Sequence, residues 1–286
     1  MMRGMQNDFS RPLAVMAIVN RTPDSFYDKG KTFALDAAVA AGAAAFEAGA
    51  TIVDVGGVKF APGPAVAIED EIALVVPVVR ELALLGDVSV DTFHPAVARA
   101  AIEAGAAIIN DTTGLRDPQM ADVVADSEAR IVIAHSLATP RTQHPLPHYD
   151  DVTAEVGAFL RQRSDLALER GIPAERIIID PGRDRNKNTL QTLEITRRLD
   201  EIAAIGFPLL VALSNKDFIG EALGRERDQR VAGSLAAAVF CVLHGASIVR
   251  AHNVPETVDA LRMVESILGW RVPENLVHNM RAEGND

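Results

Sequence analysis

Short apolar runs rich in valine and isoleucine alternate along the chain with longer stretches of helical periodicity. The apolar runs occupy residues 14–19, 50–55, 87–90, 106–110, 130–135, 176–180, 208–213 and 246–250. The helical stretches occupy residues 34–49, 67–86, 94–105, 117–128, 149–171, 190–206, 228–245 and 255–269. Runs of this length without polar alternation are typical of parallel strands that helices cover on both faces. The pattern therefore predicts eight strands that alternate with eight helices.

Eight strand–helix units within 286 residues favour an α/β protein folded as a single (β/α)8 TIM barrel over a doubly wound open sheet. No GxGxxG motif follows the first run, and no linker or low-complexity segment divides the chain. One domain is therefore expected over residues 1–286, with its core at about 13–268 and short flexible ends. Left-handed helix caps are predicted at Gly49, Gly86, Gly105, Gly171, Gly206 and Gly245.

A hydrogen-bonding or charged side chain lies at or just beyond the end of every apolar run. In chain order these are Asn20, Asp54, Asp91, Asn110, His135, Asp180, Ser214 with Lys216, and Arg250 with His252. Helix capping explains any one of them, but capping does not require a polar residue at the end of every strand. Because barrel active sites lie at the carboxyl ends of the strands, the sequence predicts one site at that rim.

The chemistry of this rim favours a polar ring system that lies beside an anion. Acceptors and amides suited to a flat heterocycle come from Asp54, Asp91, Asn110 and Asp180. Positive charge on the last two strands, where barrels often bind phosphate, comes from Lys216, Arg250 and His252. Asn20 offers an oxygen of the kind that Mg²⁺ accepts beside phosphates and water. No serine or cysteine nucleophile has a suitable base nearby in the sequence.

Composition and charge limit the partners. The formal net charge is −11, and the basic footprint of a nucleic-acid or anionic-membrane partner is missing. Cys241 stands alone in an apolar stretch and is expected to be a core thiol. The N-terminus lacks the apolar segment of a signal peptide, and no run reaches the roughly 18 apolar residues of a membrane span. We therefore expect a cytoplasmic protein that acts on small molecules.

Six segments together resemble the dihydropteroate synthase family: NRTPDSFYDKG (20–30), IVDVGGVKFAPG (52–63), VSVDTFHPAVARAAIEAGAAIINDTTGL (88–115), IIIDPG (177–182), PLLVALSNKDFIGEALG (208–224) and GASIVRAHNV (245–254). The resemblance is collinear from about residue 14 to 267. It implies a (β/α)8 barrel that joins 6-hydroxymethyl-7,8-dihydropterin pyrophosphate to p-aminobenzoate, giving dihydropteroate and pyrophosphate in folate synthesis. Mg²⁺ as cofactor and a homodimer are also implied. In the family mechanism the pyrophosphate leaves first, and the aryl amine captures a carbocation-like pterin methylene.

The resemblance also implies a role for each rim residue. Asn20 would help to hold Mg²⁺ on the pyrophosphate, and the loop after it would cover that group and the second substrate. The pterin edge would be bound by Asp91, Asn110, Asp180 and Lys216, and Asp54 would approach the pterin and pyrophosphate side. Arg250 and His252 would cradle the departing pyrophosphate. Catalysis by Lys216, Arg250 and His252 would then consist of electrostatic stabilisation and positioning.

The residues that would bind aminobenzoate depart from the family pattern. Phe60 stands in place of a threonine and Ala61 in place of an arginine, which removes an anion partner. Arg185 stands where an aromatic ring would pack against the aminobenzoate. Asn215 replaces an arginine, and Asp217 adds a negative charge near the helix start that would receive the substrate carboxylate. Two carboxylates at close range repel each other.

These departures leave several interpretations open. Lys59, Arg21 and Arg185 could rebuild the second half of the site, and the chain would then be an active synthase. The variant loops also resemble a divergent second-copy subfamily whose members have been considered poor or inactive synthases. The chain would then be an inactive or altered-specificity pterin-binding paralogue. A pterin-dependent methyltransferase barrel would share the acceptor ring but would not need the cations of the last two strands.

Overall fold

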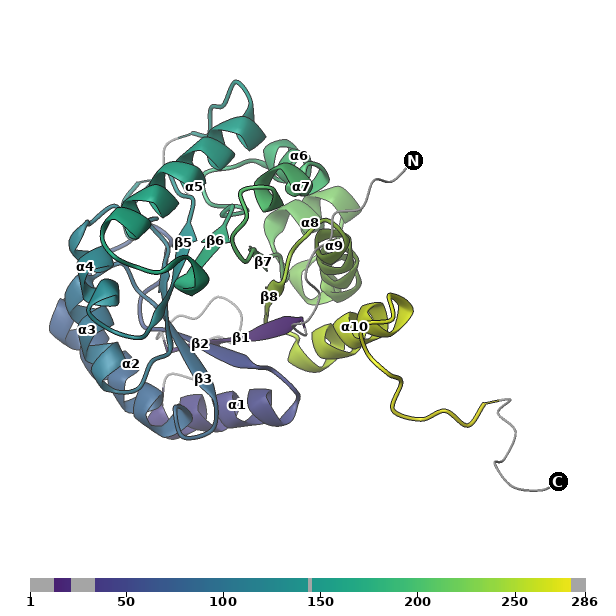
Figure 1. Ribbon diagram of the computed structural model, residues 1–286, viewed down its shortest axis with the longest axis horizontal. Helices are drawn as coiled ribbons and strands as arrows, with labels where there is room; N and C mark the ends of the chain where they lie inside the picture. The colour runs from purple at the N-terminus through teal and green to yellow at the C-terminus, as the bar shows by residue number, and fades with distance from the viewer. Residues whose placement is uncertain (1–12, 22–33, 144–145, 279–286) are drawn as a thin grey trace.

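Eight parallel strands form a nearly closed barrel with helices around its outside (Figure 1). The computed structural model describes residues 13–21, 34–143 and 146–278, so the ends that were expected to be flexible lie largely outside it. The strands are β1 (Ala14–Asn20), β2 (Ile52–Gly56), β3 (Asp87–Asp91), β4 (Ile108–Asp111), β5 (Arg130–Ala134), β6 (Ile177–Asp180), β7 (Leu210–Ala212) and β8 (Ile248–Ala251). They pair in the order β6-β5-β4-β3-β2-β1-β8-β7, and a parallel bridge between Ile179 and Leu209 joins the two ends. This topology confirms the predicted (β/α)8 barrel.

A helix follows each strand, as the sequence predicts. The α-helices are α1 (Leu35–Glu47), α2 (Ile68–Leu82), α3 (Pro95–Glu103), α4 (Gln119–Ala125), α5 (Val152–Glu169), α6 (Thr189–Arg197), α7 (Leu199–Ala203), α8 (Asp217–Leu223), α9 (Val231–Leu243) and α10 (Val254–Ile267). Short 3-10 turns are η1 (Ala174–Arg176) and η2 (Arg227–Gln229). The helix expected at 190–206 is divided into α6 and α7, and α8 is an addition between β7 and α9. None of the described helices is long and apolar enough to cross a membrane.

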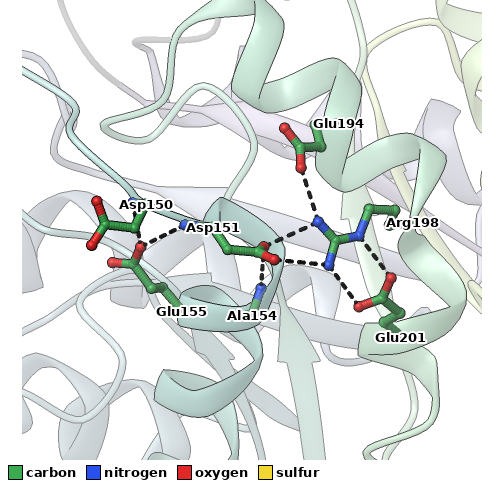
Figure 2. A network of polar contacts seen from close by, with 7 residues as sticks. All are labelled: Asp150, Asp151, Ala154, Glu155, Glu194, Arg198 and Glu201. Carbon is green, nitrogen blue, oxygen red and sulfur yellow. Dashed lines mark hydrogen bonds and ion pairs between the residues drawn. The ribbon is translucent and has the colours of Figure 1, made fainter.

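Arg198 lies at the division between α6 and α7 and forms a network of ion pairs there (Figure 2). Its guanidinium contacts Glu194 at 2.9 Å, Glu201 at 2.7 Å and Asp151 at 3.1 Å. Asp151 is also the N-cap of α5, where its carboxylate accepts the N–H of Ala154 at 2.9 Å. One arginine therefore joins the start of α5 to the turn between two later helices.

A layer of apolar side chains fills the barrel interior: Met16, Ile52, Ile108, Val132, Ile178, Leu210, Ala212 and Ile248. Side chains two positions apart on a strand point to the same face of a sheet. The next inward positions on β2, β4, β6 and β8 are Asp54, Asn110, Asp180 and Arg250. The alternation that builds the core therefore also places these polar groups in the next layer, at the C-terminal mouth of the barrel.

Most of the predicted glycine caps are left-handed. The angle φ lies between 91° and 108° at Gly49, Gly105, Gly171, Gly206 and Gly245. Gly86 is a correction, because it is not among the described glycines with positive φ. A Cβ at Gly86 would instead lie 2.7 Å from the ring of Phe46, so close packing is what requires glycine there.

Candidate active site

Asp54 and Arg250 form a buried ion pair at the centre of the mouth. The Asp54 carboxylate accepts the Nε–H of Arg250 at 2.6 Å and the amide of Asn110 at 3.1 Å. Arg250 Nη2 also lies 3.4 Å from Asp91 Oδ2. Burial lowers the pKa of Arg250, but the two carboxylates outweigh burial and raise it. Burial and the charge of Asp54 raise the pKa of Asp91 to about 6.

Two acceptor atoms of this cluster are buried without a donor from the described part of the chain. They are Asp54 Oδ1 and Asn110 Oδ1. An unsatisfied buried acceptor costs about 1–3 kcal/mol, so each such atom in a folded protein calls for an explanation, such as water or a ligand. The base of the mouth is therefore suited to a ligand that donates hydrogen bonds.

The loop after β6 brings Asp180 and Lys216 into one electrostatic neighbourhood. Asp180 accepts the N–H of Gly182 at 2.8 Å, which orients its carboxylate at the end of β6. The Lys216 amine, at the start of α8, donates to the carbonyl of Arg183. Burial lowers the pKa of Lys216 to about 8, although the charges of Asp184 and Asp180 oppose that change.

His252 and Ser214 lie on the side of the mouth that β7 and β8 form. Ser214 Oγ accepts the backbone N–H of His252 at 3.1 Å and lies 3.2 Å from His252 Nδ1. A cavity of about 200 Å³ is lined by Ile18, Asp184, Ala212, Ser214, Asn215, Lys216, Asp217, Arg227, Arg250 and His252. The three predicted basic side chains thus share one cavity, an arrangement that suits the phosphate groups of a ligand.

Asn20 ends β1 beside Gly56 of β2. A Cβ at Gly56 would lie 3.2 Å from Asn20 Oδ1, so glycine leaves room for the amide. The described residues contain no group of three or more His, Cys, Asp or Glu side chains that could hold a metal ion. Mg²⁺ that takes one protein oxygen and fills its other positions with phosphate and water still fits Asn20. The covering loop expected after Asn20 falls on residues 22–30, outside the described residues.

Phe60 and Arg185, two of the departures from the family pattern, contact each other at the mouth. The Arg185 guanidinium lies 5.0 Å from the centroid of the Phe60 ring, and its Nη1 donates to the carbonyl of Thr112 at 3.1 Å. Arg141 braces the loop of Phe60 through a hydrogen bond to the carbonyl of Ala61 at 3.1 Å. A cation and an aromatic ring from two different loops therefore pack together here.

The other predicted replacement residues make different contacts. Arg21 Nη1 donates to the carbonyl of Leu74 on α2 at 2.6 Å, which directs this guanidinium towards the scaffold. Asn215 is buried, and its amide donates to Asn253 at the start of α10 at 2.9 Å. Of the proposed replacement cations Lys59, Arg21 and Arg185, it is Arg185 whose contacts place it at the mouth.

His135, the strand-end residue of β5, supports the scaffold of the site. Its Nδ1 lies 2.8 Å from Lys187 Nζ, and this amine also donates to the carbonyls of Gly182 and Arg185, each at 3.0 Å. Burial, followed by the charge of Lys187, lowers the pKa of His135 to about 2. The neutral imidazole therefore serves as a partner of Lys187 under the loop that carries Arg185.

Glu71 and Thr92 lie behind Asp91 and were not predicted from the sequence. Thr92 Oγ1 donates to Glu71 Oε1 at 2.6 Å, and both side chains are buried. Burial raises the pKa of Glu71 to about 7. Thr92 directly follows the strand-end residue Asp91, and this position could have indicated it from the sequence. Glu71 could not be recognised in this way, because it resembles an ordinary acidic residue in the first turn of a helix.

The chain is similar to known proteins over most of its length. Residues 16–252 match the protein family described as pterin binding enzyme. The inactive dihydropteroate synthase 2 of Mycobacterium leprae is 42% identical over 285 residues, covering 94% of this chain and 97% of that protein. The dihydropteroate synthase of Escherichia coli is 40% identical over 269 residues, covering 93% of this chain and 95% of that protein.

A solved structure extends the agreement to three dimensions. Dihydropteroate synthase of Xanthomonas albilineans, determined with 4-aminobenzoic acid, superposes with a TM-score of 0.84 and 43% identity. The superposition covers 93% of this chain and 95% of that one. Together with the matched sequence, it shows that the chain belongs to the dihydropteroate synthase family.

Proposed function

We propose that this chain binds 6-hydroxymethyl-7,8-dihydropterin pyrophosphate and transfers its pterinylmethyl group to an arylamine in folate synthesis. The observation that carries the proposal is the pair of buried acceptors, Asp54 Oδ1 and Asn110 Oδ1, that no described residue satisfies. A pterin ring presents N–H and amino donors, which would satisfy acceptors at the base of the mouth. The basic side chains of the adjoining cavity would receive the pyrophosphate.

The reaction replaces a C–O bond with a C–N bond. As the bond from the pterin methylene to the pyrophosphate breaks, negative charge develops on the leaving oxygen, and Lys216, Arg250 and His252 stabilise that charge. Asp54 and Asp91 already hold Arg250, so its guanidinium is oriented before the substrate arrives. The arylamine then forms the C–N bond and releases one proton to solvent.

Asn20 would hold Mg²⁺ against the pyrophosphate in this proposal. Its amide oxygen would provide one ligand, and pyrophosphate oxygens and water would provide the others. The bound ion would offset the negative charge of the leaving group.

A pterin-binding paralogue with little or altered synthase activity is the second candidate. The contact between Arg185 and Phe60, together with Asp217, changes the end of the mouth where the family resemblance places the arylamine. The Mycobacterium leprae relative is named an inactive dihydropteroate synthase. A pterin-dependent methyltransferase is disfavoured because it would have no use for the basic cavity.

We also propose that the chain is a cytoplasmic homodimer. Large apolar side chains are exposed on the neighbouring helices α9 and α10: Phe240, Leu243, Met263 and Ile267. Figure 1 shows both helices on the outside of the barrel, where a second copy has access to them. Exposed apolar surface of this kind supports association through the same face of two copies.

Titration calorimetry with the pterin pyrophosphate, with and without Mg²⁺, tests the proposed function. The unaltered chain is expected to bind, more tightly with Mg²⁺. Asn110→Ala should weaken binding about 10- to 100-fold, because it removes a hydrogen-bonding group at the base of the mouth. Asn188→Ala changes the exposed N-cap of α6 and should leave the affinity unchanged.

The possible results separate the candidates. A chain that does not bind the pterin pyrophosphate at all is neither a synthase nor a pterin-binding paralogue. Binding without pyrophosphate release on addition of p-aminobenzoate favours the paralogue.

A further inference from the structure

The loop after β6 has a strained backbone. The angle φ is 65° at Gly182, 61° at Asp184 and 53° at Asn186, so every second residue from 182 to 186 is left-handed. Two of the three are not glycine, and a left-handed backbone costs such residues free energy. A conformation of this kind persists only where the surrounding contacts hold it. The loop therefore depends on an anchor.

The side chain of Lys187 supplies this anchor and is buried beneath the loop. Its amine donates to the carbonyls of Gly182 and Arg185, each at 3.0 Å, and lies 2.8 Å from His135 Nδ1. An ammonium group has three N–H donors, and these three partners use all of them. Lys187 therefore joins the end of β5 to two points of the loop after β6.

The segment between the two anchored carbonyls determines how groups of the mouth are presented. The N–H of Gly182 donates to the Asp180 carboxylate at 2.8 Å, and the carbonyl of Arg183 accepts the amine of Lys216. Burial lowers the pKa of Lys187, the charge of Asp180 opposes this, and the charge of Lys216 adds to it. A change at Lys187 is therefore transmitted to Lys216 both through the loop and through charge.

We propose that Lys187 is a positioning residue of the proposed reaction, which holds the loop after β6 so that Lys216 and the Asp180 carboxylate are in place before the pterin pyrophosphate binds. This inference rests on the proposed function, because Lys216 is one of the cations that would receive the pyrophosphate. The three partners of the Lys187 amine leave it no donor for a substrate, so it acts through the loop. Groups that are ordered in advance reduce the cost of binding.

Titration calorimetry with the pterin pyrophosphate and Mg²⁺ between pH 7 and 10 compares the unaltered chain with Lys187→Met, which keeps a similar length and removes the donors. At pH 7 the variant should bind about 10-fold more weakly, because the Arg183 carbonyl no longer fixes Lys216. The affinity of the unaltered chain should fall as the pH rises through about 8, where Lys216 loses its charge. In Lys187→Met this fall should move to higher pH by about one unit, because a neighbouring positive charge that lowers the pKa of Lys216 is gone.

The other charged groups that act on Lys216 are the same in both proteins, so a shift between them reports the loss of Lys187. These groups are Asp184, Asp180, Arg185 and Arg250. Asn188→Ala, at the next position of the chain, removes the exposed N-cap of α6 and should lower stability without touching the loop carbonyls. It should leave both the affinity and the pH of the fall unchanged. Thermal unfolding measures the stability of each variant.

Two variants of His135 test the anchor without removing the lysine. His135→Asn keeps an acceptor oxygen near the position of Nδ1, and His135→Leu removes the acceptor. His135→Leu should weaken binding about 3- to 10-fold, whereas His135→Asn should bind like the unaltered chain. This pair decides the inference even where Lys187→Met does not fold.

Each contrary result overturns a defined part of the account. Unchanged affinity in Lys187→Met, or equal affinity of the two His135 variants, overturns the inference while the proposed function stands. A weaker affinity whose fall stays at about pH 8 would assign to Lys187 only a general contribution to stability and would also overturn it. Failure of the unaltered chain to bind the pterin pyrophosphate overturns the proposed function and the inference together.

Discussion

Glu71 is a buried carboxyl group that Thr92 connects to the candidate site. It lies on α2 and accepts a hydrogen bond from Thr92, the neighbour of Asp91 in the chain. Its other oxygen, Oε2, is buried and receives no hydrogen bond from any described residue. Burial raises the pKa of Glu71 to about 7, and the charge of Asp91 acts in the same direction. The folded protein therefore favours the protonated acid.

Glu71→Gln is expected to change how stability depends on pH. Because the folded pKa lies above the ordinary value of 4.5, the contribution of Glu71 is fully present below about pH 4.5 and is lost as the pH rises to about 7. A rise from 4.5 to about 7 corresponds to about 3 kcal/mol. Relative to the unaltered chain, the variant should therefore gain about 3 kcal/mol of unfolding free energy between pH 4.5 and 8.

Denaturant titrations across this pH range measure the difference. Glu81→Gln, on the same helix but exposed, is the control and should follow the curve of the unaltered protein. Parallel curves for Glu71→Gln and the unaltered chain would show that Glu71 ionises as in solvent.

At the scale of single residues, part of the candidate site could be predicted, because the alternation of side chains along a strand determines which of them point into the barrel. Asp54, Asn110 and Arg250 each lie two positions after an inward apolar side chain, and this spacing is visible in the sequence. The contact between Phe60 and Arg185 was not predictable, because it depends on the paths of two loops far apart in the chain.

At the scale of the elements, the turn after β6 controls how Asp180 is presented. Gly182 has φ 65°, and an added Cβ would lie 2.0 Å from the carbonyl oxygen of His135. Gly182→Ala should therefore lower the unfolding free energy by about 3 kcal/mol or more, since it adds a backbone clash to the left-handed penalty. The N–H of Gly182 orients the Asp180 carboxylate, so a loop displaced by the clash should also weaken pterin pyrophosphate binding.

Gly206→Ala separates the cost of the left-handed backbone from the cost of the clash. Gly206 has φ 100°, but an added Cβ there would meet nothing within 4 Å. Its cost should be about 1–2 kcal/mol, from the left-handed backbone alone, with binding unchanged. Equal losses of stability in the two variants would show that the clash at Gly182 is relieved by movement of the loop.

The strands were predictable as elements because burial on both faces leaves a continuous apolar run. The division between α6 and α7 was not, because the ion pairs of Arg198 with Asp151, Glu194 and Glu201 are formed only after folding (Figure 2). The short helix α8 was not predicted either. Its seven residues, Asp217–Leu223, are too few for a helical period to stand out.

At the scale of the whole molecule, the exposed faces of α9 and α10 predict self-association. Leu243 and Met263 expose 58% and 59% of their surface on these neighbouring helices, and contiguous exposed apolar surface is typical of an interaction site. The double variant Leu243→Glu with Met263→Glu should convert a dimer into a monomer, because each change is present twice in a symmetric interface. Light scattering during gel filtration measures the mass, and circular dichroism shows whether the barrel is intact.

Leu84→Glu distinguishes a defined interface from general loss of apolar surface. Leu84 is 84% exposed and follows α2, a helix that lies apart from α9 and α10, with α1 between α2 and α10 (Figure 1). A dimer that survives Leu84→Glu and is lost in the double variant places the interface on α9 and α10. An unaltered chain that elutes as a monomer at micromolar concentrations would contradict the dimer. Since the mouth of a barrel is built within one chain, pterin pyrophosphate binding should persist in the monomeric variant.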